Sequence, residues 1–153
     1  MSDEPRPWRI REATRDDLPF MAEMALPFDP PANPRAVVDW GRPGDFALVA
    51  EVGGRPVGAA WYREEPDYMH GPIRPQNREV FMGIVEAERG RGLANHLMER
   101  LIEHARQGPP RLDALVAIIS PKNPDYGRAV ALCRRFQFEE PPSDNGRWLL
   151  LLV

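Results

Sequence analysis

The chain has 153 residues, a length that fits one domain with a single hydrophobic core. Hydrophobic residues make up 42% of it, charged residues make up 28%, and the formal net charge is only -3. This balance excludes a disordered chain, which would combine few apolar residues with a high net charge. The slight excess of acidic groups argues against a nucleic-acid-binding module. We expect one globular domain over residues 1–153.

No apolar segment approaches the ~20 residues that a membrane-spanning helix needs. The opening MSDEPRPW has neither the basic start nor the apolar stretch of a signal peptide, so a cytoplasmic protein is expected. Cys133 is the single cysteine, which excludes an internal disulfide, and the three histidines are scattered along the chain. The sequence therefore predicts no metal site.

The N-terminal part predicts a strand followed by two helices. Residues 8–13 have the pattern of a short strand, and Thr14 with Asp17 three residues later resembles a capping box that opens a helix. Asn33, followed by a proline, predicts the start of a short second helix that ends near Trp40.

A hairpin is expected next, with strands over 46–52 and 57–63. The connecting residues 53–56 contain two glycines, which supply the positive φ that tight hairpin turns need. The loop expected over 64–78 is longer than most connections, and loops of this length inside a compact domain are often functional.

The C-terminal half alternates strands and helices, which indicates a mixed α/β domain. Buried strands are predicted over 79–85 and 112–119, and a clear 3.6-residue apolar period predicts a helix over 93–107. Asn123, which precedes a proline, predicts the N-cap of a last helix that runs to Phe136. The final apolar strand, over 148–153, is expected inside the sheet rather than across a dimer interface.

A glycine-rich turn, Arg89-Gly90-Arg91-Gly92, joins a buried strand to the start of a helix. Main-chain N–H groups at such a turn, together with the positive end of the helix dipole, favour a phosphate. The glycines and the small Ala94 let an anion approach the main chain closely. Neither a Walker loop nor the GxGxxG of a dinucleotide-binding fold is present. A plain tight turn is the alternative, but the arginines favour an anion site.

This segment resembles the acetyl-CoA motif of the GCN5-related N-acetyltransferase (GNAT) family, R/Q-x-x-G-x-G/A, with Arg89, Gly92 and Ala94 at its defined positions. Similar stretches cover nearly the whole chain: IREATRDDL, FALVAEVGGRPVGAAW, MGIVEAERGRGLANHLMERLIEHA and AVALCRRFQF. The resemblance implies an acyl-CoA N-acyltransferase fold, an α/β domain with a V-splayed, mostly antiparallel sheet of six to seven strands and about four helices. The splay beside the fourth strand would admit the pantetheine arm of acetyl-CoA.

The resemblance also implies which residues hold acetyl-CoA. Strand residues would bind the pantetheine through main-chain groups, and the turn would hold the pyrophosphate. Asn123 is either a further pantetheine contact or merely an N-cap. The implied residues are Met82, Gly83, Ile84, Arg89, Gly90, Arg91, Gly92, Leu93, Ala94, Asn95 and Asn123.

The family's catalytic pattern is only partly present. Cys133 replaces the tyrosine that protonates the leaving thiolate, and its alternative role is that of a small buried hydrophobe. Tyr126, two helical turns earlier, either supplies the proton or covers the cofactor. The strand glutamate is displaced by one residue to Glu79, which points to the opposite face unless a bulge restores the register. Glu64, Glu65 and His70 of segment 64–78 are alternative bases.

The resemblance implies transfer of an acetyl group from acetyl-CoA to a primary amine by direct attack. The alternative is a non-catalytic acyl-CoA-binding sensor or partner domain, which the missing tyrosine and displaced glutamate support. A nucleotide-binding module is a third possibility. The expected partners are acetyl-CoA and an amine acceptor, with no nucleic acid and no membrane, and the protein would act as a monomer or homodimer.

Overall fold

The computed structural model describes residues 8–25, 36–64, 76–109, 111–142 and 146–152. Six strands form one sheet in chain order: β1 (Arg9–Glu12), β2 (Phe46–Val52), β3 (Arg55–Glu64), β4 (Asn77–Ile84), β5 (Ala114–Ile118) and β6 (Arg147–Leu151). The helices are η1 (Arg15–Asp17), α1 (Leu18–Met24), η4 (Glu86–Glu88), α2 (Leu93–Gln107) and α3 (Tyr126–Arg135), of which η1 and η4 are short 3₁₀ helices. The expected mixed α/β fold is confirmed, with three α-helices in these ranges rather than about four.

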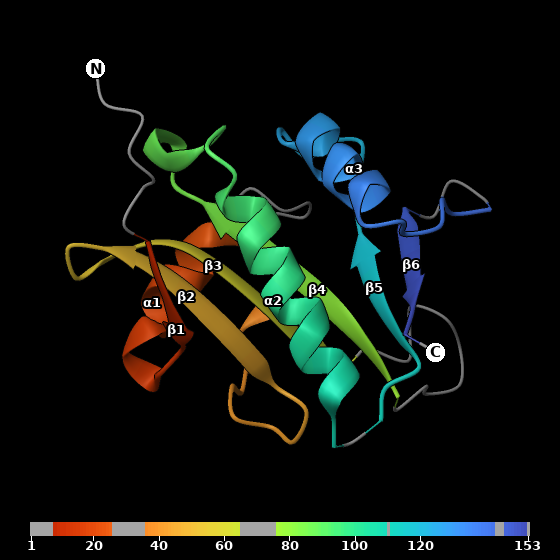
Figure 1. Ribbon diagram of the computed structural model, residues 1–153, viewed down its shortest axis with the longest axis horizontal. Helices are drawn as coiled ribbons and strands as arrows, with labels where there is room; N and C mark the ends of the chain where they lie inside the picture. The colour runs from red at the N-terminus through yellow and green to blue at the C-terminus, as the bar shows by residue number, and fades with distance from the viewer. Residues whose placement is uncertain (1–7, 26–35, 65–75, 110, 143–145, 153) are drawn as a thin grey trace.

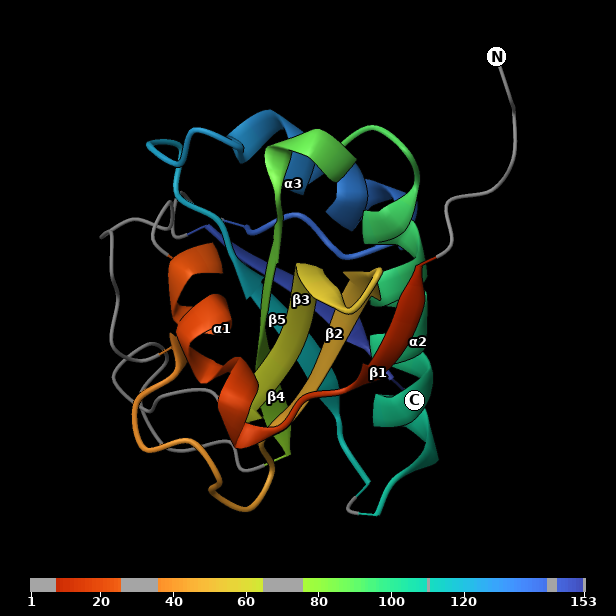
Figure 2. The same ribbon diagram turned by 90° about the vertical axis from the view of Figure 1, so that its left-hand side faces the viewer.

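The helices lie on the two faces of the sheet (Figure 1, Figure 2). Leu97 and Leu101 of α2 and Val130 of α3 pack in one apolar cluster, whereas Met21 of α1 packs with Trp61 in a second cluster on the other face. Burial of each such large side chain stabilises the fold by about 1.5–3 kcal/mol. In the described part of the chain, none of the helices is long and apolar enough to cross a membrane.

The sheet opens between its fourth and fifth strands. Neighbouring strands are antiparallel except β4 and β5, which are parallel. This parallel pairing covers only three residue pairs, from Asn77 opposite Ala114 to Glu79 opposite Val116, while β4 continues to Ile84. The V-shaped splay that the resemblance implied is therefore present beside the fourth strand.

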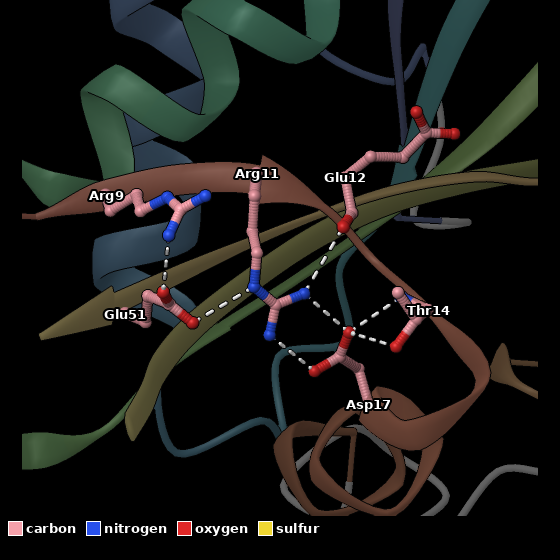
Figure 3. A network of polar contacts seen from close by, with 6 residues as sticks. All are labelled: Arg9, Arg11, Glu12, Thr14, Asp17 and Glu51. Carbon is pink, nitrogen blue, oxygen red and sulfur yellow. Dashed lines mark hydrogen bonds and ion pairs between the residues drawn. The ribbon is translucent and has the colours of Figure 1, made fainter. Parts of the chain in front are cut away.

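A network of charged side chains fixes the start of α1 (Figure 3). Thr14 N–H donates to the Asp17 carboxylate at 2.7 Å, as the predicted capping box requires. Arg11 donates to both Asp17 oxygens, at 2.8 and 2.9 Å, and to Glu51 of β2 at 3.0 Å. The hydrogen bonds from Arg11 hold the pKa of Asp17 below its usual range, so this buried carboxylate is charged at neutral pH. The helix is thereby tied to the edge of the sheet.

The hairpin is confirmed, but its turn is shorter than predicted. Only Gly53 and Gly54 form it, with φ of 58° and 81°, the positive values of a two-residue hairpin turn. Arg55 and Pro56, which the prediction placed in the turn, belong to β3. Pro56 lies opposite Glu51, where a β-bulge interrupts the register and a missing N–H is tolerated.

Two other predicted elements differ in the structure. The short second helix was predicted to begin at Asn33, outside the described residues, and it does not extend to Trp40, because Asp39 has a positive φ of 51°. The last strand, expected inside the sheet, is instead the edge strand β6. Glu139 forms an isolated bridge with Leu149 of β6, which covers part of the free edge.

The predicted start of the last helix was also wrong by two residues. The N-cap of α3 is Asp125, not Asn123. The Asn123 side-chain oxygen accepts a hydrogen bond from Asp125 N–H at 2.8 Å, which stabilises the turn before the helix rather than the helix itself.

A buried ion pair anchors the segment before β2 to β3. Arg63 donates to the two Asp45 oxygens at 2.9 and 3.1 Å, and the two side chains are only 4% and 3% exposed. Asp45 also accepts the N–H groups of Gly41 and Arg42 at 3.0 Å. The Arg63 guanidinium lies 5.3 Å above the Trp40 ring. A single carboxylate therefore holds both a buried cation and a loop.

Asp45→Ala should lower the free energy of unfolding by about 3–5 kcal/mol, because it leaves the buried Arg63 charge without this partner. Urea denaturation measures the change. Glu140→Ala is the matched control: it breaks the exposed pair with Arg134, whose side chains are 64% and 61% exposed, and should cost less than about 1 kcal/mol. Equal losses in the two variants would show that the buried ion pair contributes no more to the free energy of unfolding than the exposed pair does.

Candidate functional site

The C-terminal half of β4 presents main-chain groups toward the gap between β4 and β5. Val85 N–H donates to Val57 O at 2.9 Å, so this pair is hydrogen-bonded across β3 and β4. Because such pairs alternate along an antiparallel ladder, the main-chain groups of Met82 and Ile84 point the other way, toward β5. The pairing of β4 with β5 ends at Glu79 opposite Val116, so these groups lie beyond the ladder that would otherwise satisfy them.

The glycine-rich turn follows directly and leads into α2. Gly90 and Gly92 have positive φ values of 77° and 89°. A Cβ atom placed at either glycine would have no atom within 4 Å, apart from those of the adjacent residues, so the main chain is open to a ligand here. Gly92 is the N-cap, and no side chain caps this end of the helix. The first N–H groups of α2 have no partner within the helix and are available to an anion. The absence of a Cβ at Gly58 lets Leu93 approach β3 closely and fixes this end of α2.

The Arg89 side chain crosses the gap between β4 and β5 and is hydrogen-bonded on both sides of it. Its Nε donates to Ile84 O at 3.0 Å, and a terminal nitrogen donates to the Asp125 carboxylate at 3.2 Å. These contacts connect the end of β4 with the start of α3. The guanidinium therefore satisfies the carbonyl of Ile84, which no neighbouring strand pairs, and connects the two sides of the splay.

A cavity of about 710 Å³ lies between β4, the turn and α3, on the face of the sheet that α2 covers. This volume is within the usual range for a small-molecule site. Arg128 and Arg135 bring positive charge to its α3 wall, and Arg135 also donates to the Asn95 side chain across the two helices at 2.8 Å. The lining also includes the carboxylates of Glu86, Glu88 and Asp125, so the positive charge of this cavity is confined to its arginines and to the N-terminus of α2.

A second cavity, of about 320 Å³, reaches the same stretch of β4 from the α1 side. The two cavities share seven lining residues: Met82, Gly83, Ile84, Glu86, Arg89, Asp125 and Ala129. Two ligands that enter from opposite faces of the sheet would therefore meet at the unpaired main chain of β4. This junction is the feature of the described structure best suited to a reaction between two substrates.

The smaller cavity is acidic. Its described walls include the carboxylates of Glu23, Glu86 and Asp125 and the single guanidinium of Arg89, which is paired with Asp125. In the described part of the chain, the carboxylates of Glu23 and Glu86 have no hydrogen-bond or ion-pair partner. Such a cavity attracts a cationic ligand.

Most residues that the sequence predicted to hold acetyl-CoA come together here. The larger cavity is lined by Met82, Gly83, Ile84, Arg89, Gly90, Gly92, Leu93, Ala94 and Asn95. Arg91 is exposed and is not among the described lining residues, and Asn123 lines the smaller cavity. Sequence reasoning missed the α3 wall, formed by Arg128, Ala129, Leu132 and Arg135. Their spacing indicates one helical face, but only the structure shows that this face lines a cavity.

Two of the candidate acids lie on a different face of α3. Tyr126, Val130 and Cys133 follow the i, i+4, i+7 spacing, and Val130 and Cys133 are buried in the core. Tyr126 is 38% exposed, and neither it nor Cys133 lines either cavity. Burial raises the pKa of the Cys133 thiol from 9.0 to about 12, which makes it a weak proton donor at neutral pH.

Glu79 lies near the start of β4, far from the junction of the cavities. It is 2% exposed, lies opposite Arg63, and the β3–β4 register runs without a bulge from Gly58 to Glu64. Glu79 is therefore on the face opposite to Arg78, which occupies the position where the family often has its glutamate. It lines neither cavity. Of the alternative bases on segment 64–78, His70 and the carboxylates beyond Glu64 lie outside the described residues.

Solved structures of other proteins share this fold. YncA of Salmonella typhimurium, solved with its cofactor acetyl-CoA, superposes with a TM-score of 0.71 at 21% identity over 95% of this chain and 94% of its own. The Escherichia coli GNAT family N-acetyltransferase YhbS, solved with CoA, has a TM-score of 0.70 at 21% identity over 100% and 86% of the two chains. The GNAT domain of S. lividans PAT has a TM-score of 0.69 at 18% identity over 94% of this chain and 90% of its own. At these identities the likeness shows the fold alone.

A comparison with the curated proteins finds no match. The family model described as "Acetyltransferase (GNAT) family", by contrast, matches residues 8–138. This range includes β4, the glycine-rich turn and α3, the three segments that surround the larger cavity. Because the match extends over most of the 153 residues, the chain belongs to the GNAT acetyltransferase family.

Proposed function

We propose that this protein transfers an acetyl group from acetyl-CoA to a primary amine by direct attack. The observation that carries the proposal is the unpaired main chain of β4, reached from one face by a cavity with a phosphate-binding turn and from the other by an acidic cavity. The complexes of YncA with acetyl-CoA and of YhbS with CoA support the choice of cosubstrate.

The residues around the larger cavity fit CoA. The open main chain at Gly90 and Gly92 and the first turn of α2 would bind the pyrophosphate, and Arg128 and Arg135 add positive charge for the phosphates. Met82 and Ile84 would bind the pantetheine by extending the β4 ladder into the gap. Acetyl-CoA supplies the activated acetyl group as a thioester.

The proposed reaction forms a C–N bond and breaks the C–S bond. The oxygen of the tetrahedral intermediate carries a negative charge, and the Met82 N–H that points into the gap would stabilise it. The ammonium form of the acceptor must first lose a proton, and a second proton must leave the nitrogen as the amide forms. The thiolate that leaves is protonated on its departure.

Glu86 is the residue that we propose for accepting the proton of the amine. Of the shared lining residues only Glu86 and Asp125 carry carboxylates, and Asp125 is paired with Arg89. Glu23 on the opposite wall would draw the cationic amine into the smaller cavity. Water, rather than the buried Cys133, would protonate the thiolate.

The direct test is thiol release. Purified protein with acetyl-CoA and a panel of primary amines should release free CoA thiol, followed with a thiol reagent, and tertiary amines of similar size should release none because they cannot form a stable amide. Heat protection by CoA is measured in parallel. Protection without thiol release for any amine would identify an acyl-CoA-binding domain without turnover, and competition between ATP and CoA would instead support a nucleotide-binding module.

Gly92→Val should weaken CoA binding at least about tenfold, because a β-branched residue at φ of 89° distorts the turn whose N–H groups hold the phosphates. Titration calorimetry measures the affinity. Gly54→Val is the matched control, since Gly54 has φ of 81° and equally open surroundings but lies in the distant hairpin turn. If a folded Gly92→Val protein binds CoA as tightly as the control, the phosphates are bound somewhere other than at this turn.

Cys133→Ala should leave turnover within a few-fold, whereas Glu86→Gln should lower it by about a hundredfold, the low end of general acid–base catalysis. The alanine variant should lose about 1 kcal/mol of stability. In the wild-type protein, stability should fall as the pH rises from 9.0 toward about 12, because the thiol ionises in the unfolded chain while the native thiol keeps its proton.

Urea titrations of the wild-type and Cys133→Ala proteins across this pH range measure the linkage, and the variant should show a smaller decline. A hundredfold loss of turnover in Cys133→Ala, with unchanged CoA affinity and melting curve, would instead make Cys133 the catalytic acid.

A further inference from the structure

Gly83 is the point at which α1 rests on β4. A Cβ atom at this position would lie 2.6 Å from Met24 Cβ and 2.9 Å from Met24 O, so any side chain larger than hydrogen would displace the helix. Gly83 lines both cavities, and Met24 lines only the smaller one. The last residue of α1 is thus placed against the strand beside the junction of the two cavities.

Met24 cannot move away from this position without disturbing α1. The N-cap of the helix is Asp17, which Arg11 holds through two hydrogen bonds. The helix is anchored near its end by Met21 and Ala25, which are 0% and 2% exposed. Ala25 N–H also donates to Met21 O at 3.1 Å. The main chain of Met24 is therefore fixed, and only its side chain beyond Cβ adapts to a ligand.

The cavity that Met24 lines has about 320 Å³, which is at the lower end of the range for ligand sites. Its Met24 wall is apolar and flexible, and its other walls include the carboxylates of Glu23 and Glu86. These walls fit a cationic nitrogen on a slender hydrocarbon chain better than one on a bulky or branched group.

We infer that Met24, seated on Gly83, determines the size of the amine that reaches the thioester, and that it selects slender primary alkylamines over bulky ones. This inference rests on the proposed acetyl transfer. Because Met24 lines the acceptor-side cavity and not the larger one, its substitution should change the choice of amine and leave the binding of CoA unchanged.

The experiment compares Met24→Ala, Met24→Trp and the wild type with a series of primary amines that runs from ethylamine to benzylamine and to a branched amine such as tert-butylamine. Met24→Ala retains the Cβ and the carbonyl that rest on Gly83 and removes only the rest of the side chain. Phe20→Ala is the matched control, a truncation on the same helix at a residue that lines neither cavity.

Met24→Ala should raise kcat/KM for the bulky amines relative to ethylamine by about tenfold or more, the size of effect that a few methylene groups produce in a pocket. Met24→Trp should lower kcat/KM about tenfold for every amine, while Phe20→Ala should keep the wild-type order. All three variants should bind CoA within about twofold of the wild type, as measured by calorimetry.

The outcomes separate this inference from the proposed function. If the wild type releases thiol with amines but both Met24 variants, folded and binding CoA, keep the wild-type order of substrates, Met24 does not determine size and only this inference is overturned. The same conclusion holds if Phe20→Ala changes the order as much as Met24→Ala does. If the wild type releases no thiol with any amine, the proposed function and this inference are both overturned.

Discussion

The separation of β4 from β5 after three residue pairs is the constraint on which the site depends. A strand inside a sheet normally gives its main-chain groups to neighbours on both sides, and leaving them unpaired costs free energy unless a ligand or water binds them. Here β3 satisfies one edge of β4 throughout, while the other edge has no strand partner at Met82 and Ile84, beyond the last pair of Glu79 with Val116. The fold thus holds hydrogen-bonding groups in fixed positions, ready for a ligand that completes the ladder.

The helices determine what can reach this open edge. On one face, the first N–H groups of α2 follow its N-cap, Gly92, without a partner in the helix, and α3 brings arginines to the opposite wall. On the other face, α1 rests on the bare main chain of Gly83 and leaves a smaller, acidic space. Arg89 joins the two sides of the gap through Ile84 O and Asp125. Charge and size therefore differ between the faces, as a reaction between an anionic cosubstrate and a cationic amine requires.

Proton transfer in our proposal does not use the residues that the family resemblance indicated. A tyrosine at the position of Cys133 would extend beyond the helix, but the thiol is buried and its pKa is raised to about 12 by the loss of solvent. Glu79 is equally buried and lies toward the other end of β4. Acetyl transfer in our proposal depends mainly on positioning, on the electrostatic stabilisation of the intermediate and on one exposed carboxylate.

The sequence by itself determined the elements with a strong local signal. The 3.6-residue period predicted α2 to its last residue, the glycine pair predicted the hairpin, and the glycines at 90 and 92 predicted a tight turn before α2. These features depend on backbone conformation and on the spacing of apolar residues, which neighbouring residues largely fix.

Only the tertiary structure decided how side chains distant in the sequence meet. The α3 face with Arg128 and Arg135, the edge position of β6 and the contact of Met24 with Gly83 depend on how helices pack across the sheet. A helical period identifies which residues share a face but not what that face contacts, and the face of Glu79 required the observed β3–β4 register. The conformation of the glycine-rich turn is therefore local, whereas the smaller cavity between α1 and β4 is a product of packing.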